Sequence, residues 1–309
     1  MMIDQGNKIY FTVTQTEEGM LLREFLLETK QISRSGLSKL KNHGKILCNG
    51  EFVTVRKKLT EGDQVTLIYP KEAISEYLKP ESVFLNIVYE DNDLLLVNKP
   101  AGLCVHPTKA YPTGTLANGV IFYLQSKGEE AGFRSVNRLD MDTSGLVLIA
   151  KNSYSMQQLF LQQQQKLLLR SYQALVQGSI TWQRNTITDP IRKIDGKTAK
   201  REIHLTGQRA VTHVEVIKAY SEHTLIKLVL ETGRTHQIRL HLANMGFPLV
   251  GDSLYGGSRC LMSRHALHTD YIQFAHPRTA EKLSFQLPLP SDMQAALEEL
   301  RRKQISHHP

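Results

Sequence analysis

The sequence predicts an α+β fold in two parts. These are a small N-terminal α+β domain and a large domain built on a mixed, mainly antiparallel β-sheet with flanking helices. Three observations support this: the 309 residues suffice for two cores, a polar segment with two prolines interrupts the chain, and most later apolar runs are short and strand-like. The expected units are 12–69 for the small domain, 70–82 for a linker, 83–295 for the large domain and 296–309 for a C-terminal tail.

The first part of the chain contains two helical patterns followed by strands. The apolar spacing in 21–26 predicts a short helix, and 33–44 predicts a second with Leu37 and Leu40 inward and Gly44 at its end. The segments KILC, EFVTV and QVTLIY then predict three strands, the first two joined by an Asn-Gly turn. Together these elements predict a small sheet under the helices.

Strand patterns dominate the large domain. We expect strands in IVYE, LLLVNK, GLVLIAK, SYQALVQG, THVEVIKAY and TLIKLVLET. The segment SMQQLFLQQQQKLL is the clearest helix, because its apolar residues keep helical spacing around a run of glutamines. This pattern is typical of a large sheet with helices packed against it.

Composition is that of a globular protein, with 41% hydrophobic and 22% charged residues. No apolar run approaches the eighteen residues or so that a membrane span needs, and the first twenty residues lack the features of a secretory signal, so we expect a cytoplasmic protein without a membrane segment. The three cysteines are far apart and odd in number, which argues against a disulfide framework and against a thiolate metal site.

Positive charge is concentrated near the N-terminus. The whole chain carries a net charge of +8, and the stretch from Lys30 to Lys58 holds eight Lys or Arg against one acid, Glu51, a local charge of +7. The candidate contacts are Arg34, Lys39, Lys41 and Lys45. Such a patch fits a polyanionic partner, and it fits a merely solvated surface equally well on these residues alone.

The segment VNRLDMDTSGLVLIAKN combines two carboxylates with an apolar strand. Asp140 is expected at the strand end, where loops commonly carry chemistry, whereas Asp142 and Thr143 fit an ordinary turn. A metal pair is disfavoured because Arg138 would repel a cation. An aspartic protease would need a second copy of the Asp-Thr/Ser-Gly turn, which the chain lacks.

Two further segments suggest site residues. In ETGRTHQIRLHLANMG, Arg234 lies in a glycine-containing turn, and Thr235 is expected to cap a helix that ends near Gly246. In VNKPAGLCVHPT, a lysine and Pro-Gly punctuation follow an apolar strand. Each segment alone is weak evidence for a site.

Taken in order, these segments resemble the RluA/RluC/RluD family of RNA pseudouridine synthases. The resemblance rests on VNKPAGLCVHPT, VNRLDMDTSGLVLIAKN, RSYQALVQG, ETGRTHQIRLHLANMGFPLVGDSLYGG and ALHTDYIQFAHPRTAEKLSFQLPLP. The basic module resembles the RNA-binding domain named after ribosomal protein S-four. Two departures are Asn137, where the family commonly has His, and Arg170, where Lys is usual.

The resemblance implies a catalytic site made of Asp140, Tyr172 and Arg234. Asp140 would act on the sugar, either as a nucleophile or by assisting departure of the base, and Arg234 would hold it in its charged form. Tyr172 would stack on the base. Arg138 would fill the space that an extruded uridine leaves in the RNA.

Further substrate contacts are expected from Asn137, Thr143 and Ile238, the last as a pocket wall or as plain core. The implied partner is RNA, ribosomal RNA first and transfer RNA second, for a protein that is a monomer and uses no metal or cofactor. Two rival hypotheses remain at this stage: a non-catalytic RNA-binding or ribosome-assembly protein, and a hydrolase that releases the free base.

Overall fold

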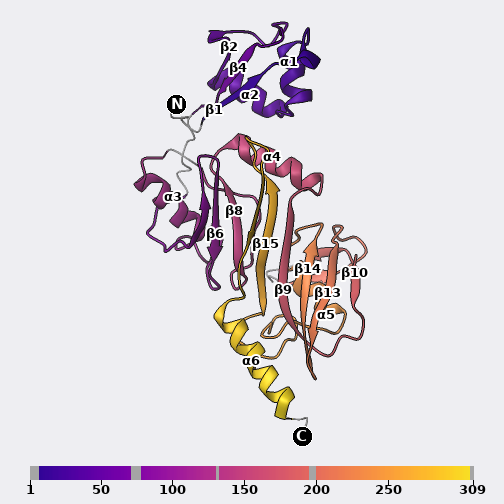
Figure 1. Cartoon of the computed structure of the whole chain (residues 1–309). Helices are drawn as coiled ribbons and strands as arrows, with labels where there is room; N and C mark the ends of the chain where they lie inside the picture. The colour runs from indigo at the N-terminus through magenta and orange to yellow at the C-terminus, as the bar shows by residue number, and fades with distance from the viewer. Residues whose placement is uncertain (1–6, 71–77, 130–131, 195–199, 307–309) are drawn as a thin grey trace.

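The computed structural model describes residues 7–70, 78–129, 132–194 and 200–306. It contains a small N-terminal module and a larger domain around one long sheet (Figure 1). The predicted α+β class with a mainly antiparallel large sheet is confirmed. Most of the expected linker 70–82 lies outside the described residues.

The N-terminal module is a four-stranded antiparallel sheet in the order β1-β4-β2-β3, covered by helices. Its elements are β1 Lys8–Thr12, η1 Gln15–Glu17, α1 Leu22–Glu24, η2 Phe25–Thr29, α2 Arg34–His43, β2 Lys45–Cys48, β3 Glu51–Phe52 and β4 Gln64–Ile68. Leu37 and Leu40 of α2 are buried as predicted, and Gly44 follows its last residue. The unit starts earlier than the expected residue 12, which is the last residue of β1. All of β1 belongs to the unit, because it pairs with β4 along its whole length.

In the part of the chain that the structure describes, ten strands make up the large sheet, with the path β10-β13-β14-β9-β15-β8-β6-β5, β16 on β15 and β7 on β8. The strands are β5 Ile87–Glu90, β6 Leu94–Lys99, β7 Arg134–Ser135, β8 Ser144–Ala150, β9 Leu169–Gln177, β10 Arg184–Ile187, β13 Thr212–Ala219, β14 His223–Leu230, β15 Leu267–Ala275 and β16 Lys282–Gln286. A separate hairpin pairs β11 Ile191–Lys193 with β12 Arg201–Ile203. All described pairings in the large sheet are antiparallel except that of β8 with β15.

Strand β8 is buried on both faces, which explains its continuous apolar sequence. Val147 and Ile149 belong to one core, and Leu146 and Leu148 belong to the core on the opposite face. At the parallel contact, Gly145 has φ +114°, and a Cβ there would lie 2.2 Å from the Thr269 carbonyl oxygen. Only glycine allows the strand that follows Asp140 to approach β15 so closely.

Among the described residues, four helices complete the large domain: α3 Leu116–Ser126, α4 Ser153–Gln164, α5 Gln237–Asn244 and α6 Ser291–Ser306. Helix α4 lies at the end of the sheet nearest the N-terminal module, and α6 lies at the opposite end (Figure 1). The expectation of a tail at 296–309 is wrong for residues 296–306, because they belong to α6. Ala296, Leu297 and Leu300 of this helix are buried. Across the described residues, no helix combines the length and apolar character that crossing a membrane requires.

Candidate active site

A cleft of about 790 Å³ opens between the loop before β8, the end of α4 and the segment that joins β14 to α5. Six Lys or Arg and two acids line it, an excess of four positive charges. The cations are Arg138, Lys166, Arg170, Arg209, Arg234 and Arg239, and the acids are Asp140 and Glu231. An electropositive cleft of this kind favours a polyanionic substrate.

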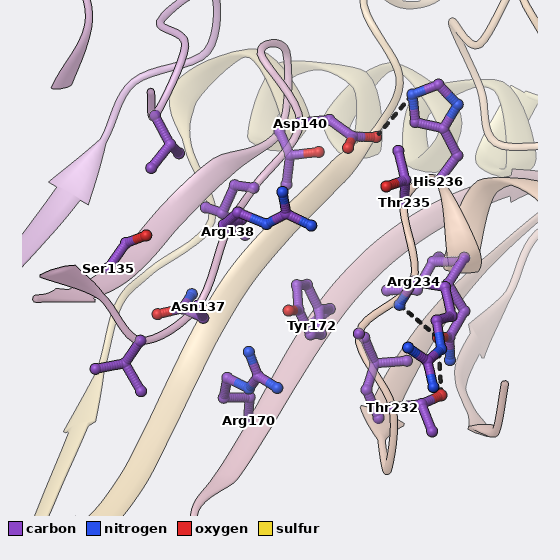
Figure 2. Close-up of a pocket in the computed structure, with 18 of the residues that line it drawn as sticks. Ser135, Asn137, Arg138, Asp140, Arg170, Tyr172, Thr232, Arg234, Thr235 and His236 are labelled. Carbon is purple, nitrogen blue, oxygen red and sulfur yellow. Dashed lines mark hydrogen bonds and ion pairs between the residues drawn. The ribbon is translucent and has the colours of Figure 1, made fainter. Parts of the chain in front are cut away.

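Asp140 lies at the edge of this cleft, in the turn that leads into β8. The Thr143 backbone N–H donates to the Asp140 carbonyl oxygen at 3.1 Å, which closes the turn. The Asp140 side chain is 24% exposed, so a ligand can reach it. Its Oδ2 accepts a hydrogen bond from Arg239 Nη1 at 3.0 Å and lies 3.9 Å from His236 Nε2 (Figure 2). The structure therefore places Asp140 next to the start of β8, as the sequence predicted.

Arg239 joins Asp140 to a second, buried carboxylate. Its Nε and Nη2 donate to the two oxygens of Asp252 at 2.7 and 2.8 Å, and its guanidinium lies 5.3 Å from the centre of the Tyr255 ring. Burial opposes the charged form of Arg239, but the hydrogen bonds to Asp252 and the charge of Asp140 outweigh it and raise its pKa. The same contact outweighs the burial of Asp252, whose pKa is lowered. The guanidinium is thus fixed by one acid while it contacts the other.

The expected pairing of Arg234 with Asp140 is wrong. Arg234 lines the cleft, but its Nε donates to the Arg209 carbonyl oxygen at 3.0 Å. The local reason is the start of α5, where the N-cap is His236, with φ +58°, and not Thr235 as predicted. This left-handed residue redirects the chain, and Arg239 in the first turn of α5 contacts Asp140 instead.

Tyr172 and Ile238 form the apolar wall of the cleft. Tyr172 lies on β9 and is 4% exposed, and its hydroxyl has no hydrogen-bond partner among the described residues. Ile238 on α5 is equally buried and shares the same core cluster. Both expectations for Ile238, pocket wall and core, therefore hold together.

The other predicted contact residues divide into exposed and committed side chains. Arg138 is exposed and extends into the cleft, whereas Arg170 is 7% exposed on the cleft wall (Figure 2). The Asn137 amide donates to the Leu146 carbonyl oxygen at 3.0 Å and accepts from the Leu148 N–H at 2.9 Å. Asn137 thus joins the loop to β8, and its capacity for RNA contacts is small.

Thr143 is also committed inside the protein. Its hydroxyl lies 2.7 Å from His265 Nε2, and both side chains are buried. Burial lowers the pKa of His265 to about 4, so this histidine is neutral at ordinary pH. Thr143 lines the cleft and supports the turn that carries Asp140.

A buried lysine supports the same turn. Lys99, from the VNKPAG segment, is fully buried, and its Nζ donates to the carbonyl oxygens of Pro100, Leu103 and Met141 at 2.8 to 2.9 Å. Burial lowers its pKa to about 7. The Met141 carbonyl also accepts from the Gly102 N–H. The lysine and glycine of this segment therefore fix the residue that follows Asp140.

One group of three possible metal ligands is found in the described part of the chain, and it lies apart from the residues lining the cleft: Asp91, Asp93 and His276. Asp91 bonds to His276 and Tyr89, and Asp93 forms an ion pair with Arg278 at 2.7 Å. The neighbouring guanidinium would repel a metal ion. This group serves as a buried polar network.

Sequence reasoning missed Arg239, His236, Asp252 and His265. All except His265 lie within the quoted segment ETGRTHQIRLHLANMGFPLVGDSLYGG. The spacing of His236 and Arg239 around the start of a predicted helix was a usable signal for a pair facing one side. No local pattern connects them to Asp140, which lies 99 residues before Arg239 in the chain.

Fold and cleft together define an enzyme for a polyanionic substrate, with one accessible carboxylate held by a buried arginine. The chain belongs to the RNA pseudouridine synthase family, in the RluA/RluC/RluD branch. The family model for RNA pseudouridylate synthase matches residues 93–244. The enzyme is accordingly an isomerase that acts on uridine in RNA.

Similar proteins extend over nearly the whole chain. A Bacillus subtilis protein named uncharacterized RNA pseudouridine synthase YjbO is 42% identical over 81% of this chain and 88% of its own length. Ribosomal large subunit pseudouridine synthase D of Vibrio parahaemolyticus is 36% identical over 94% of each chain. The solved structure of human RNA pseudouridylate synthase domain containing 1 has a TM-score of 0.57 and 25% identity, covering 74% of this chain and 98% of its own.

Proposed function

We propose that this protein converts specific uridines of ribosomal RNA to pseudouridine, with Asp140 as the catalytic carboxylate. The observation that carries the proposal is the placement of Asp140. It is the accessible acid in the electropositive cleft that a buried arginine contacts directly, with Arg239 Nη1 at 3.0 Å from its oxygen. The name of the Vibrio parahaemolyticus relative, which refers to the large ribosomal subunit, supports ribosomal RNA over transfer RNA.

The reaction breaks the bond between the base nitrogen and the ribose, turns the base over and joins a ring carbon to the sugar. Asp140 serves as nucleophile at the sugar or as the group that assists departure of the base, and both roles need its charged form. The Arg239 guanidinium favours that form by charge and hydrogen bonding. Tyr172, buried on the cleft wall, offers a flat surface for the uracil ring.

The target base must leave its stack to reach Asp140, at a cost of a few kcal/mol. Arg138 is suited to offset part of this cost, because it is exposed in the cleft two residues before Asp140 and its planar cation can stack between bases. Arg170 and Arg234 supply further positive charge along the wall.

The N-terminal module is assigned to binding RNA phosphates through Arg34, Lys39, Lys41 and Lys45. Arg34 and Lys41 are exposed on α2, and Lys45 begins β2 next to that helix. Two other cations of the basic stretch are engaged inside the module, since Lys30 pairs with Glu17 and Lys57 pairs with Asp63. We assign the protein to the cytoplasm, where ribosomal RNA is accessible, and we expect a monomer.

Replacing the carboxylate tests the proposal. Asp140→Asn should fold normally and lose far more than about tenfold, or 1.4 kcal/mol of barrier, in pseudouridine formation. Asp142→Asn is the matched control, because the same chemical change lies two residues away in the same turn. Product analysis separates the rivals: isomerised uridine supports the proposal, an abasic site indicates a hydrolase, and unchanged RNA with wild type indicates a binding protein. Mapping pseudouridine in ribosomal and transfer RNA with and without the gene identifies the target.

A further inference from the structure

The N-terminal module contacts the catalytic domain through the first half of α4. Tyr154 of α4 is 6% exposed and belongs to the module's own hydrophobic core, where its ring lies 6.3 Å from that of Tyr69. A residue of the catalytic domain thus completes the core of the module. Such a contact restricts the relative motion that two domains joined only by a tether would have.

Polar contacts flank this apolar one. Gln157 Nε2 donates to the Gln31 carbonyl oxygen at 2.5 Å, and Gln158 Nε2 donates to the Lys30 carbonyl oxygen at 3.5 Å. These carbonyls lie just before α2, whose first turn also approaches α4: a Cβ on Gly36 would lie 3.4 Å from Gln157 Oε1. The helix that carries Arg34, Lys39 and Lys41 therefore begins against α4.

A second contact fixes the sheet of the module. Arg278 is held by both oxygens of Asp93, with Nε at 2.7 Å and Nη2 at 2.8 Å, and its Nη1 donates to the Lys8 carbonyl oxygen at the start of β1. Asp93 is almost fully buried in the catalytic domain, so Arg278 has little freedom. The module is thus held at α4 and at β1.

The second half of the same helix reaches the active-site cleft. Phe160, Gln163 and Gln164 of α4 line it, together with Lys166 just beyond the helix. At about 1.5 Å per residue, Gln157 and Gln164 are about 10 Å apart along the axis. The contact with the basic module and the wall of the cleft are therefore two ends of one short, rigid element.

We propose that the surface formed by Tyr154, Gln157, Gln158 and Arg278 is a specificity-determining interface. It holds the module at a fixed position on α4, so RNA bound to the basic surface presents to the cleft only uridines at a matching distance and direction. A tethered module would raise local RNA concentration without imposing this geometry. The inference rests on the proposed function, because it requires RNA to bind the module and the cleft together.

The test removes the polar contacts of the module with α4 without touching the cleft, and Tyr154 and Arg278 stay in place. The double variant Gln157→Ala/Gln158→Ala removes both side chains that donate hydrogen bonds to the module. Alanine has a high helix propensity, so α4 itself should remain intact. Gln165→Ala is the control, since Gln165 is exposed at the other end of the helix. Loss of both hydrogen bonds should lower the preference for the main target uridine over other uridines in ribosomal RNA by about tenfold. The rate on a short hairpin that cannot reach the module should stay within about twofold.

A structural measurement accompanies the activity assay. Small-angle scattering should show the wild type as a compact particle, and amide exchange in 153–158 should become faster in the double variant because the two side-chain hydrogen bonds to the module are lost. Gln157→Asn/Gln158→Asn, which shortens each side chain and keeps its polarity, replaces the alanine variant if that variant does not fold.

Three results overturn the inference: an extended wild-type particle, a double variant with unchanged site preference, or an equal loss of activity on the short hairpin. The scattering result needs no catalysis. Absence of pseudouridine with the wild type would therefore contradict the proposed function, whereas an extended wild-type particle would contradict the interface.

Discussion

Replacing Arg239 by methionine should expose how much the cleft depends on one guanidinium. Methionine keeps most of the length of the side chain and removes three charged hydrogen bonds, two to Asp252 and one to Asp140. The Asp252 side chain is 1% exposed and would be left as a buried, unpaired charge. Removing one member of such a pair costs about 3–5 kcal/mol of unfolding free energy, or roughly 6–20 °C in melting temperature.

The loss of stability should depend on pH, with a sign that the structure fixes. In the wild type the pKa of Asp252 is lowered, so its contribution is present above the pKa of the unfolded chain and is lost only as pH falls through the lower, folded value. In Arg239→Met the main groups that lower the pKa of Asp252 are gone, and burial raises that pKa against the smaller influences of His265 and the Tyr255 N–H. The cost of the buried charge is then greatest at high pH and decreases as pH falls, so the difference between the proteins should be larger at pH 8 than at pH 5.

Urea unfolding at several pH values measures this difference, and pseudouridine formation is assayed on the same samples. The double variant Arg239→Met/Asp252→Asn removes the buried charge, so it should recover most of the stability and none of the activity, since Asp140 still lacks its cation. A loss of stability that is equal at pH 5 and pH 8 would refute the reasoning, and so would a double variant as unstable as Arg239→Met.

Three further predictions concern RNA. Arg234→Met should weaken RNA binding and leave the rate at saturating RNA within about tenfold of wild type, because Arg234 contacts the Arg209 carbonyl and not Asp140; a larger fall in that rate would return Arg234 to the catalytic group. Deleting residues 1–69 should reduce the slope of log RNA affinity against log salt concentration by about one per lost phosphate contact, while the chemistry survives at high RNA concentration; an unchanged slope would leave the basic patch without a role. Phe160→Ala should weaken RNA binding by about 1–3 kcal/mol, the value of one base stacked on an aromatic ring, because Phe160 is 48% exposed at the cleft; Phe160→Trp should retain binding, and equal binding by both variants would exclude stacking.

Local patterns predicted the strands and the placement of Asp140 because the features that decide them are local. The buried run of β8 and its glycine, Gly145, are readable in the 7 residues of this strand. The C-terminal helix was missed although its signal was present, since Met293, Ala296, Leu297 and Leu300 have helical spacing and are buried. That miss was avoidable.

The partner of Asp140 was not predictable in the same way. Two arginines lie five residues apart near the start of α5, and the choice between them depends on the left-handed conformation of His236 and on the position of Asp252. Neither is visible in hydrophobic periodicity. The same holds for the contact of Tyr154 with the N-terminal module, because an apolar face on a helix does not indicate which core it completes.

The order of strands has a consequence for how the enzyme comes into being. Asp140 precedes β8 and Tyr172 lies on β9, only 32 positions later, yet β15 is inserted between these two strands. A growing chain that already contains Asp140, Tyr172 and Arg239 still lacks β15, the strand that holds β8 and β9 at the right separation. Activity can therefore begin only after Leu267–Ala275 has left the ribosome, so a nascent chain cannot modify RNA before this strand has been made and has paired with β8 and β9.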